Sequence, residues 1–302
     1  MSIKIGRLVV NILKHNSYRS ALKRREMYKP YGKYEELIDV PYIDDGKYNH
    51  KFDIMYGTGE KKNCCIIDIH GGSYIFGEHI DQYVFGEYFL KHGYDFISAD
   101  YVPNNGKRST KDLLDDLYDM LLYVLDHRKE LKLENDVFVI TGDSAGGHLS
   151  LTLCEAIDDK EYAKELGYEF PDDFVVKACL VNCPVYNFIA LPDGHLLRSG
   201  KKRMFGPSYK DPQLFKLLDP KTHIDSLKMP LFVSTCKQDF LRMHALDIAN
   251  DMRGRDIDFQ IVDIDSDEKG IAHVHNVLHP FKKESAEVND AMLEFMNKAI
   301  TK

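Results

Sequence analysis

The sequence lacks several features that would assign it to large classes of protein. Its 302 residues include no tryptophan, and its six cysteines form no C-x-x-C pair. A zinc or thioredoxin-type site therefore has no support. No run of about eighteen apolar residues occurs, so no segment is expected to span a membrane. The formal net charge is −8, which argues against a nucleic-acid partner.

The cysteines and the first residues indicate a compartment. Most cysteines lie in apolar segments, and the six are Cys64, Cys65, Cys154, Cys179, Cys183 and Cys236. We expect them to be buried free thiols of a cytoplasmic protein. Near the N-terminus, Asn11 and Lys14 interrupt a short apolar run, and no small-residue cleavage site follows. A secretory signal peptide is therefore not expected.

The most informative stretch runs from Val137 to Ser150. It opens with the β-branched apolar composition of a buried parallel strand, and its leucines after 148 suit a packed helix. Between them stands Gly142-Asp143-Ser144-Ala145-Gly146, a G-x-S-x-G pattern whose glycines allow a sharp strand-to-helix turn. Such a turn presents the serine hydroxyl at its tip, near the positive end of a helix dipole. We interpret Ser144 as a candidate nucleophile, with an ordinary capping serine as the alternative.

A second motif lies upstream of this turn. Residues 64–69 have the composition of a buried strand and are followed at once by His70-Gly71-Gly72-Ser73. Glycines in this position let backbone N–H groups approach a ligand, as in the oxyanion-hole loop that precedes a nucleophile elbow. The predicted oxyanion donors are the backbone N–H groups of Gly71, Gly72 and Ala145.

Together the two motifs resemble those of the α/β-hydrolase superfamily and, within it, the hormone-sensitive-lipase-like esterases. The resemblance extends from about Tyr34 to the C-terminus. Ser73 replaces the third glycine of the family's usual HGGG, which adds a Cβ where the loop can require a positive φ. The resemblance implies an α/β-hydrolase fold with a Ser-His-Asp triad.

The apolar patterns along the chain agree with that fold. Alternating strands and helices with short connections predict a single domain over 1–302, with a mainly parallel sheet and helices on both faces. The strands are expected at 36–43, 51–56, 64–69, 95–99, 137–140, 174–181, 231–235 and 259–264, and the helices at 78–92, 110–125, 240–252, 284–300 and after Ser144. The first two strands should form an antiparallel hairpin.

Two segments interrupt the alternation and are expected to cap the sheet, at about 1–33 and 184–229. Residues 3–26 have the spacing of an amphipathic helix, with an apolar face made by Ile5, Leu8, Val9, Ile12 and Leu13. We interpret it as a lid, with a helix docked on the body or a membrane-surface helix as alternatives. The second segment is rich in proline, and its basic cluster Lys201-Lys202-Arg203 is read as a solvated face or, alternatively, as an attractor of anionic substrate.

A nucleophilic serine needs a base, and in this fold the chain order is serine, acid, histidine. Asp239 lies in the loop after the strand expected at 231–235, at the sheet edge where binding sites gather. The resembled family places its acid here, and the alternative role is that of a helix N-cap. The fallback acids are Asp263, Asp265 and Asp267.

Three histidines follow the strand expected at 259–264, namely His273, His275 and His279. The family pattern of histidine, one residue and an aromatic residue matches His273, with His275 in the aromatic place. We assign His273 as the base and keep His275 as the alternative. His148 is expected to be a buried hydrogen-bonding residue, and His70 an anchor of the oxyanion loop.

The resemblance implies a carboxylesterase, a serine hydrolase that acts on a small ester with a short acyl chain. It would proceed through an acyl-enzyme, without a metal or an organic cofactor. An amidase or formamidase would use the same groups. The non-enzymatic alternative is a catalytically silent binder on this fold, similar to the gibberellin receptor. A small-molecule ester is the expected partner, and a homodimer is left open.

Overall fold

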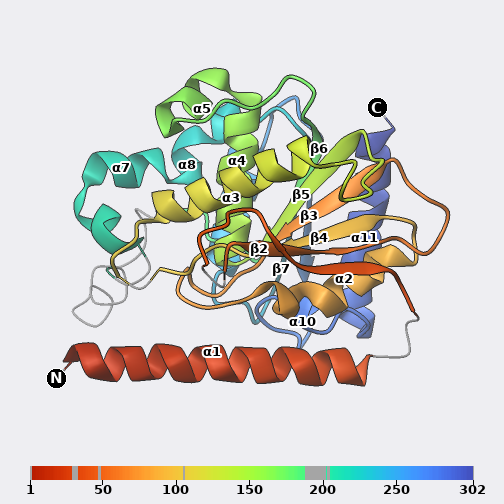
Figure 1. Cartoon of the computed structure of the whole chain (residues 1–302), viewed down its shortest axis with the longest axis horizontal. Helices are drawn as coiled ribbons and strands as arrows, with labels where there is room; N and C mark the ends of the chain where they lie inside the picture. Colours follow the sequence, from red (N-terminus) through yellow and green to blue (C-terminus); the bar gives the residue numbers. More distant parts are fainter. Residues whose placement is uncertain are drawn as a thin grey trace.

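The computed structural model of the protein describes residues 2–28, 33–46, 49–104, 106–187, 202 and 205–301. A sheet forms its centre and helices cover both faces (Figure 1). The strands are β1 (Glu36–Pro41), β2 (Lys51–Met55), β3 (Cys64–Ile69), β4 (Asp95–Ala99), β5 (Val137–Asp143), β6 (Val175–Asn182), β7 (Leu231–Cys236) and β8 (Phe259–Ile264). The longer helices are α1 (Ser2–Met27), α2 (Tyr83–Leu90), α3 (Thr110–Asp126), α4 (Ala145–Asp158), α9 (Arg242–Asp251) and α11 (Lys283–Ile300). The shorter ones are η2 (His79–Gln82), α5 (Lys160–Leu166), η3 (Gly206–Lys210), α7 (Pro212–Leu217), α8 (Pro220–His223), η4 (Ile224–Ser226) and α10 (His275–Leu278).

The strand order is β1-β2-β4-β3-β5-β6-β7-β8. β1 and β2 form an antiparallel pair, β2 is antiparallel to β4, and the strands from β4 to β8 are all parallel. The predicted hairpin and the mainly parallel sheet are confirmed. In the register, Ile69 pairs with Gly142, and Asp143 pairs with Asn182. The carboxyl ends of neighbouring strands are therefore level, and the loops that follow them meet at one edge.

The apolar core is divided by the sheet into two layers. Alternate residues of a strand point to opposite faces. In β3, Cys65, Ile67 and Ile69 belong to the cluster that includes α3 and α4, whereas Cys64 and Ile66 belong to the cluster that includes α2 and α11. Both faces are covered, which is why every residue of this strand except the buried Asp68 is apolar.

Several predicted boundaries differ from the structure. The helix expected at 78–92 is divided into η2 and α2, and α9 begins two residues later than expected. Helix α5 was not predicted; its N-cap is Asp159, whose side chain accepts the N–H groups of Glu161 and Tyr162. All six cysteines are free and buried, as predicted. None of the helices in the described ranges is long and apolar enough to cross a bilayer.

The expected N-terminal helix is present as α1, which lies as a straight rod along one side of the body (Figure 1). It is attached to η2: the Ser17 hydroxyl and the Arg24 guanidinium both donate to Asp81, at 3.0 and 3.3 Å. Ile12, from the predicted apolar face, is about half exposed at 49%. The side chains of Ile5, Leu8, Val9 and Leu13 lie outside the described residues.

The second expected cap segment is described in part. Its helices α7 and α8 lie on the side of the sheet that carries α4 and α5 (Figure 1). Of its two short 3-10 helices, η3 contacts α3 and η4 contacts α4. Phe205, Leu218 and Ile224 are buried in the cluster that includes α3 and α4. Of the predicted basic cluster, Lys201 and Arg203 lie outside the described residues, and Lys202 is exposed.

Candidate active site

Ser144 is the single residue between the end of β5 and the start of α4. Its backbone has φ 53° and ψ −114°, a left-handed conformation that a residue with a Cβ seldom adopts. The surrounding backbone maintains this turn, because the Ser144 N–H donates to the Asn182 carbonyl at 2.8 Å and the Ser144 carbonyl accepts the Val185 N–H at 3.0 Å. The expected strand-to-helix turn is therefore present, and it is sharp and strained.

The glycines of the G-x-S-x-G pattern are required by close packing. A Cβ on Gly146 would overlap the carbonyl oxygen of Ile69, at the end of β3. A Cβ on Gly142 would overlap the Ser150 hydroxyl in the first turns of α4. Without these two side chains, α4 begins directly against the loop that carries His70 and Gly71.

Asp239 and His273 approach Ser144 from two other loops. Asp239 follows β7, and His273 lies between β8 and α10. His273 Nε2 is 3.0 Å from Ser144 Oγ, and His273 Nδ1 is 2.6 Å from Asp239 Oδ1. These contacts join the three residues in one chain of hydrogen bonds, although Ser144 and His273 are 129 positions apart.

The environment of Asp239 favours its ionised form. Burial by itself raises the pKa of Asp239. The hydrogen bond and charge of His273, together with the hydrogen bonds from the Leu241 N–H and the Thr235 hydroxyl, lower this pKa by more than burial raises it. The net result is a pKa below the ordinary aspartate value. A buried carboxylate held this way can stabilise a neighbouring imidazolium.

The side chains of His275 and His148 each have a hydrogen-bond partner other than the Ser144 hydroxyl. His275 is buried, its Nδ1 lies 2.9 Å from the Ser285 hydroxyl, and burial lowers its pKa to about 4. His148 is also buried, as predicted, with Nε2 2.8 Å from the Leu218 carbonyl oxygen, and burial lowers its pKa to about 3. Among the described residues, only His273 is within hydrogen-bonding distance of the Ser144 hydroxyl.

The fallback acids are engaged with cations away from this chain of hydrogen bonds. Asp263 forms a two-pronged ion pair with Arg242, with its shortest contact at 2.6 Å. Asp265 and Asp267 both pair with Lys237, at 3.2 and 3.1 Å.

The loop after β3 also differs in one respect from expectation. The Gly71 N–H, one of the three predicted oxyanion donors, donates to Asp143 Oδ1 at 2.9 Å. This N–H is therefore already engaged within the loop, and the role of Gly71 as an oxyanion donor stays a prediction. His70 lies beside it, with Nδ1 2.6 Å from the Gly71 carbonyl oxygen and its ring stacked on Tyr101.

Gly72 and Ser73 form the turn itself. Gly72 has φ 114°, and Ser73 has φ 52°, which confirms that the third position of this motif requires a positive φ. Residues with a Cβ reach that region at a cost of about 1–3 kcal/mol. The strain at Ser73 resembles that at Ser144, and both residues lie at the same edge of the sheet.

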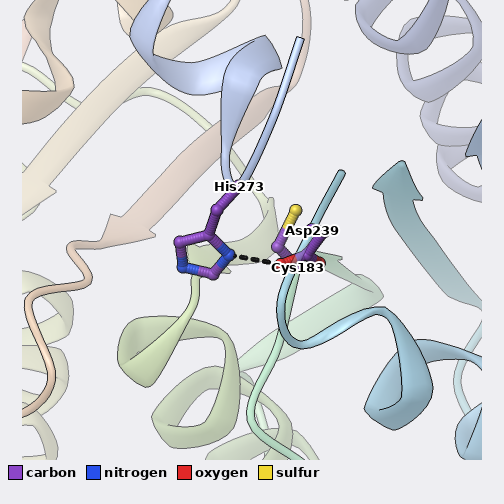
Figure 2. A group of neighbouring side chains, drawn as sticks. All are labelled: Cys183, Asp239 and His273. Atoms are coloured by element: carbon purple, nitrogen blue, oxygen red, sulfur yellow. Dashed lines mark hydrogen bonds and ion pairs between the residues drawn. The ribbon is translucent and has the colours of Figure 1, made fainter. Parts of the chain in front are cut away.

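Sequence reasoning missed several residues that support the site. Gln82, at the end of η2, donates to Asp143 Oδ1 at 2.6 Å, and Thr235 donates to Asp239 Oδ2 at 2.8 Å. Cys183 lies beside Asp239 and His273 (Figure 2), and its sulfur accepts the Val274 N–H at 3.2 Å. No local motif marks Gln82 or Cys183. Thr235 and Asp143 carry a weak signal, because each stands close to a predicted site residue at a strand end.

Comparison with known proteins bears on this arrangement. The BD-FAE family model matches residues 52–244, more than half of the chain. The chain belongs to the BD-FAE family. The BD-FAE match includes Ser144 and Asp239, whereas His273 lies beyond it. A search of curated protein sequences found no match.

Solved structures with the same fold accompany the BD-FAE match. The chain is 18% identical to esterase B from Lactobacillus rhamnosis, with a TM-score of 0.85 over 99% of this chain and 96% of that one. It is 19% identical to an esterase from Pyrobaculum calidifontis, with a TM-score of 0.71 over 96% and 93%. It is 18% identical to EstE1, a thermostable carboxylesterase from a metagenomic library, with a TM-score of 0.70 over 96% and 97%. The α/β-hydrolase fold predicted from the two motifs is confirmed.

Proposed function

We propose that this protein is a serine hydrolase that cleaves carboxylic esters, with Ser144 as nucleophile, His273 as base and Asp239 as acid. The observation that carries the proposal is the hydrogen-bonded chain Asp239–His273–Ser144, with contacts of 2.6 and 3.0 Å. Such a chain at a nucleophile elbow suits acyl transfer. The similar solved structures support it, since they are esterases, one of them inhibited by a phosphonate.

In the proposed reaction, Ser144 Oγ attacks the ester carbonyl while His273 Nε2 takes its proton. His273 then gives this proton to the departing alcohol, leaving Ser144 acylated. Water, deprotonated by the same histidine, then attacks the acyl carbon; the bond to Ser144 Oγ breaks, the acid leaves, and His273 returns the proton to Oγ. Asp239 keeps the Nδ1 proton of His273 in place, so that Nε2 carries the lone pair needed for each proton transfer.

The oxyanion of each tetrahedral intermediate would be held by backbone N–H groups of Gly72 and Ala145. Each such donor contributes roughly 2.7–4 kcal/mol of barrier lowering in related chemistry. Asp143, by holding Gly71, and Gln82, by holding Asp143, would keep this loop in register with the elbow.

The substrate class is proposed from the resemblance, and one exposed side chain at the rim of the site supports it. Phe240 directly follows Asp239, is 76% exposed, and has its ring centroid 4.2 Å from that of His273. Met243 is 71% exposed on the first turn of α9. The exposed Phe240 ring beside the base suits the apolar part of a small ester with a short acyl chain.

Hydrolysis of p-nitrophenyl acetate tests the proposal. The wild-type protein should release p-nitrophenol with saturation, and Ser144→Ala should reduce the rate to background. His273→Ala should lose activity, whereas His275→Ala, a buried histidine two residues away, should keep it if the fold is intact. A protein that binds the ester without turnover would instead be a silent binder, and faster cleavage of p-nitroacetanilide would identify an amidase.

We also propose a cytoplasmic location. Six buried free thiols support it, since a reducing compartment keeps such thiols from pairing.

A further inference from the structure

Three different metal-ligand groups meet behind the base. The Cys183 sulfur, a carboxylate oxygen of Asp239 and a ring nitrogen of His273 all lie within 4.8 Å of one another (Figure 2). They come from the loops after β6, β7 and β8, whose strands are neighbours in the sheet. Cys183 and Asp239 are buried, and the His273 side chain is 20% exposed. An ion could therefore approach from the side of the imidazole.

This donor set matches the coordination chemistry of zinc. Zn²⁺ binds thiolate sulfur, imidazole nitrogen and carboxylate oxygen in a tetrahedron, with ligand bonds of about 2.0–2.3 Å. Neighbouring ligands in such a tetrahedron lie roughly 3.3–3.8 Å apart, so the three groups need only small movements. The Val274 N–H, which donates to Cys183 Sγ at 3.2 Å, would orient the sulfur from outside the ligand shell.

We propose that Cys183, Asp239 and His273 form an inhibitory site for a thiophilic divalent cation, of which Zn²⁺ and Cd²⁺ are examples. The ion enters the gap between His273 Nδ1 and Asp239, now closed by their 2.6 Å hydrogen bond. The Cys183 thiol loses its proton to solvent. His273 stays neutral, with its nitrogen-bound proton on Nε2 and its Nδ1 lone pair on the metal. The charges of thiolate and carboxylate balance that of the ion.

The inhibitory effect, which rests on the proposed function, follows from the tautomer. In the metal-free protein Nε2 faces Ser144 Oγ at 3.0 Å and can accept its proton. With the ion on Nδ1, Nε2 already carries a proton and cannot act as a base. The ion therefore replaces the Nδ1 proton and leaves the ring protonated on Nε2, the nitrogen that must accept the Ser144 proton, and inhibition should be reversible with a chelator.

Direct binding separates this proposal from the proposed function. Metal-free Ser144→Ala keeps all three ligands and needs no catalytic activity, so it can be titrated with CdCl₂ while the thiolate-to-cadmium absorption is recorded. We expect one equivalent to bind with a thiolate band. The band should disappear in Ser144→Ala/Cys183→Ser and persist in Ser144→Ala/Cys179→Ser, which lacks a buried thiol earlier in β6. A band that survives without Cys183, or no binding at all, would overturn the proposal.

The wild-type protein supplies two further measurements that need no cysteine variant. Zinc X-ray absorption should show one sulfur ligand at about 2.3 Å, and a shell of nitrogen and oxygen alone would count against the site. Micromolar ZnCl₂ should lower p-nitrophenyl acetate hydrolysis at least tenfold, with recovery in EDTA, whereas MgCl₂ should have no effect because Mg²⁺ does not favour thiolate. Equal inhibition by both ions would contradict a site built on Cys183.

Discussion

Replacing Asp239 with asparagine tests whether the negative charge of this carboxylate contributes to catalysis. Asp239 Oδ1 accepts both His273 Nδ1–H and the Leu241 N–H, at 2.6 and 2.9 Å, and Oδ2 accepts the Thr235 hydroxyl at 2.8 Å. In Asp239→Asn only the amide oxygen can satisfy the Leu241 N–H, while the Thr235 hydroxyl can rotate to accept from the amide nitrogen. We therefore expect the oxygen to keep facing His273, so that the tautomer is preserved and only the negative charge is lost.

The lost charge determines the size of the effect. An imidazolium and a carboxylate about 4 Å apart attract each other by about 4 kcal/mol at an effective dielectric constant of 20. The remaining neutral hydrogen bond retains about 1 kcal/mol of that. A net loss of about 3 kcal/mol in the transition state corresponds to roughly a 10²- to 10³-fold lower kcat. If the amide rotated and presented its nitrogen to Nδ1, the wrong tautomer would raise the loss to about 10⁴-fold.

Steady-state hydrolysis of p-nitrophenyl acetate measures both kcat and KM for this variant. KM should stay within about twofold, because Asp239 is separated from the substrate by His273. The matched control is Asp263→Asn, in which an acid already paired with Arg242 is neutralised, and its kcat should change little. More than a tenth of the wild-type kcat in Asp239→Asn would refute the role of its charge. A loss near 10⁴-fold would refute the argument that Leu241 holds the oxygen in place.

Three further expectations follow from single contacts. Gly71→Ala places a Cβ against the Asp143 carboxylate. The oxyanion loop should move, and kcat/KM for p-nitrophenyl acetate should fall about 10²-fold. An unchanged kcat/KM would refute this tight packing. Burial alone lowers the pKa of His79, but the hydrogen bond and charge of Asp100, with the charge of Asp53, raise this pKa to about 9. The resulting stabilisation of the folded state, about 3 kcal/mol, is complete below pH ~6.5 and is lost as pH rises through about 9. Urea unfolding at pH 7 and pH 10 should show this loss of unfolding free energy in the wild type and a smaller loss in His79→Gln. Equal losses in the two proteins would contradict the role of His79. Phe240→Ala should raise KM for p-nitrophenyl butyrate more than for the acetate, because the exposed ring beside His273 is lost; equal changes would remove Phe240 from the substrate surface.

Much of the fold could be predicted because it is encoded in short stretches. The expected limits 64–69, 95–99 and 259–264 coincide with β3, β4 and β8. These strands are short stretches rich in apolar residues, and the sharp turn at Ser144 needs glycine two positions to either side, so each carries a signal within a few residues. The start of α9 was predicted two residues too early, because Phe240 and Leu241 form a turn without a change in composition.

The sequence by itself determined the nucleophile elbow, the alternating strands and the loops on which Asp239 and His273 stand, because each follows from neighbours along the chain. The family pattern favoured His273 over His275, and the tertiary structure brings His273 to Ser144. Val274, at φ 53°, turns the backbone so that His273 faces the sheet edge and His275 enters α10. The tertiary structure also directs the Gly71 N–H to Asp143 and brings Cys183 beside Asp239. These outcomes depend on the parallel register that aligns the strand ends, and that register joins residues too far apart in the chain for any local pattern to record.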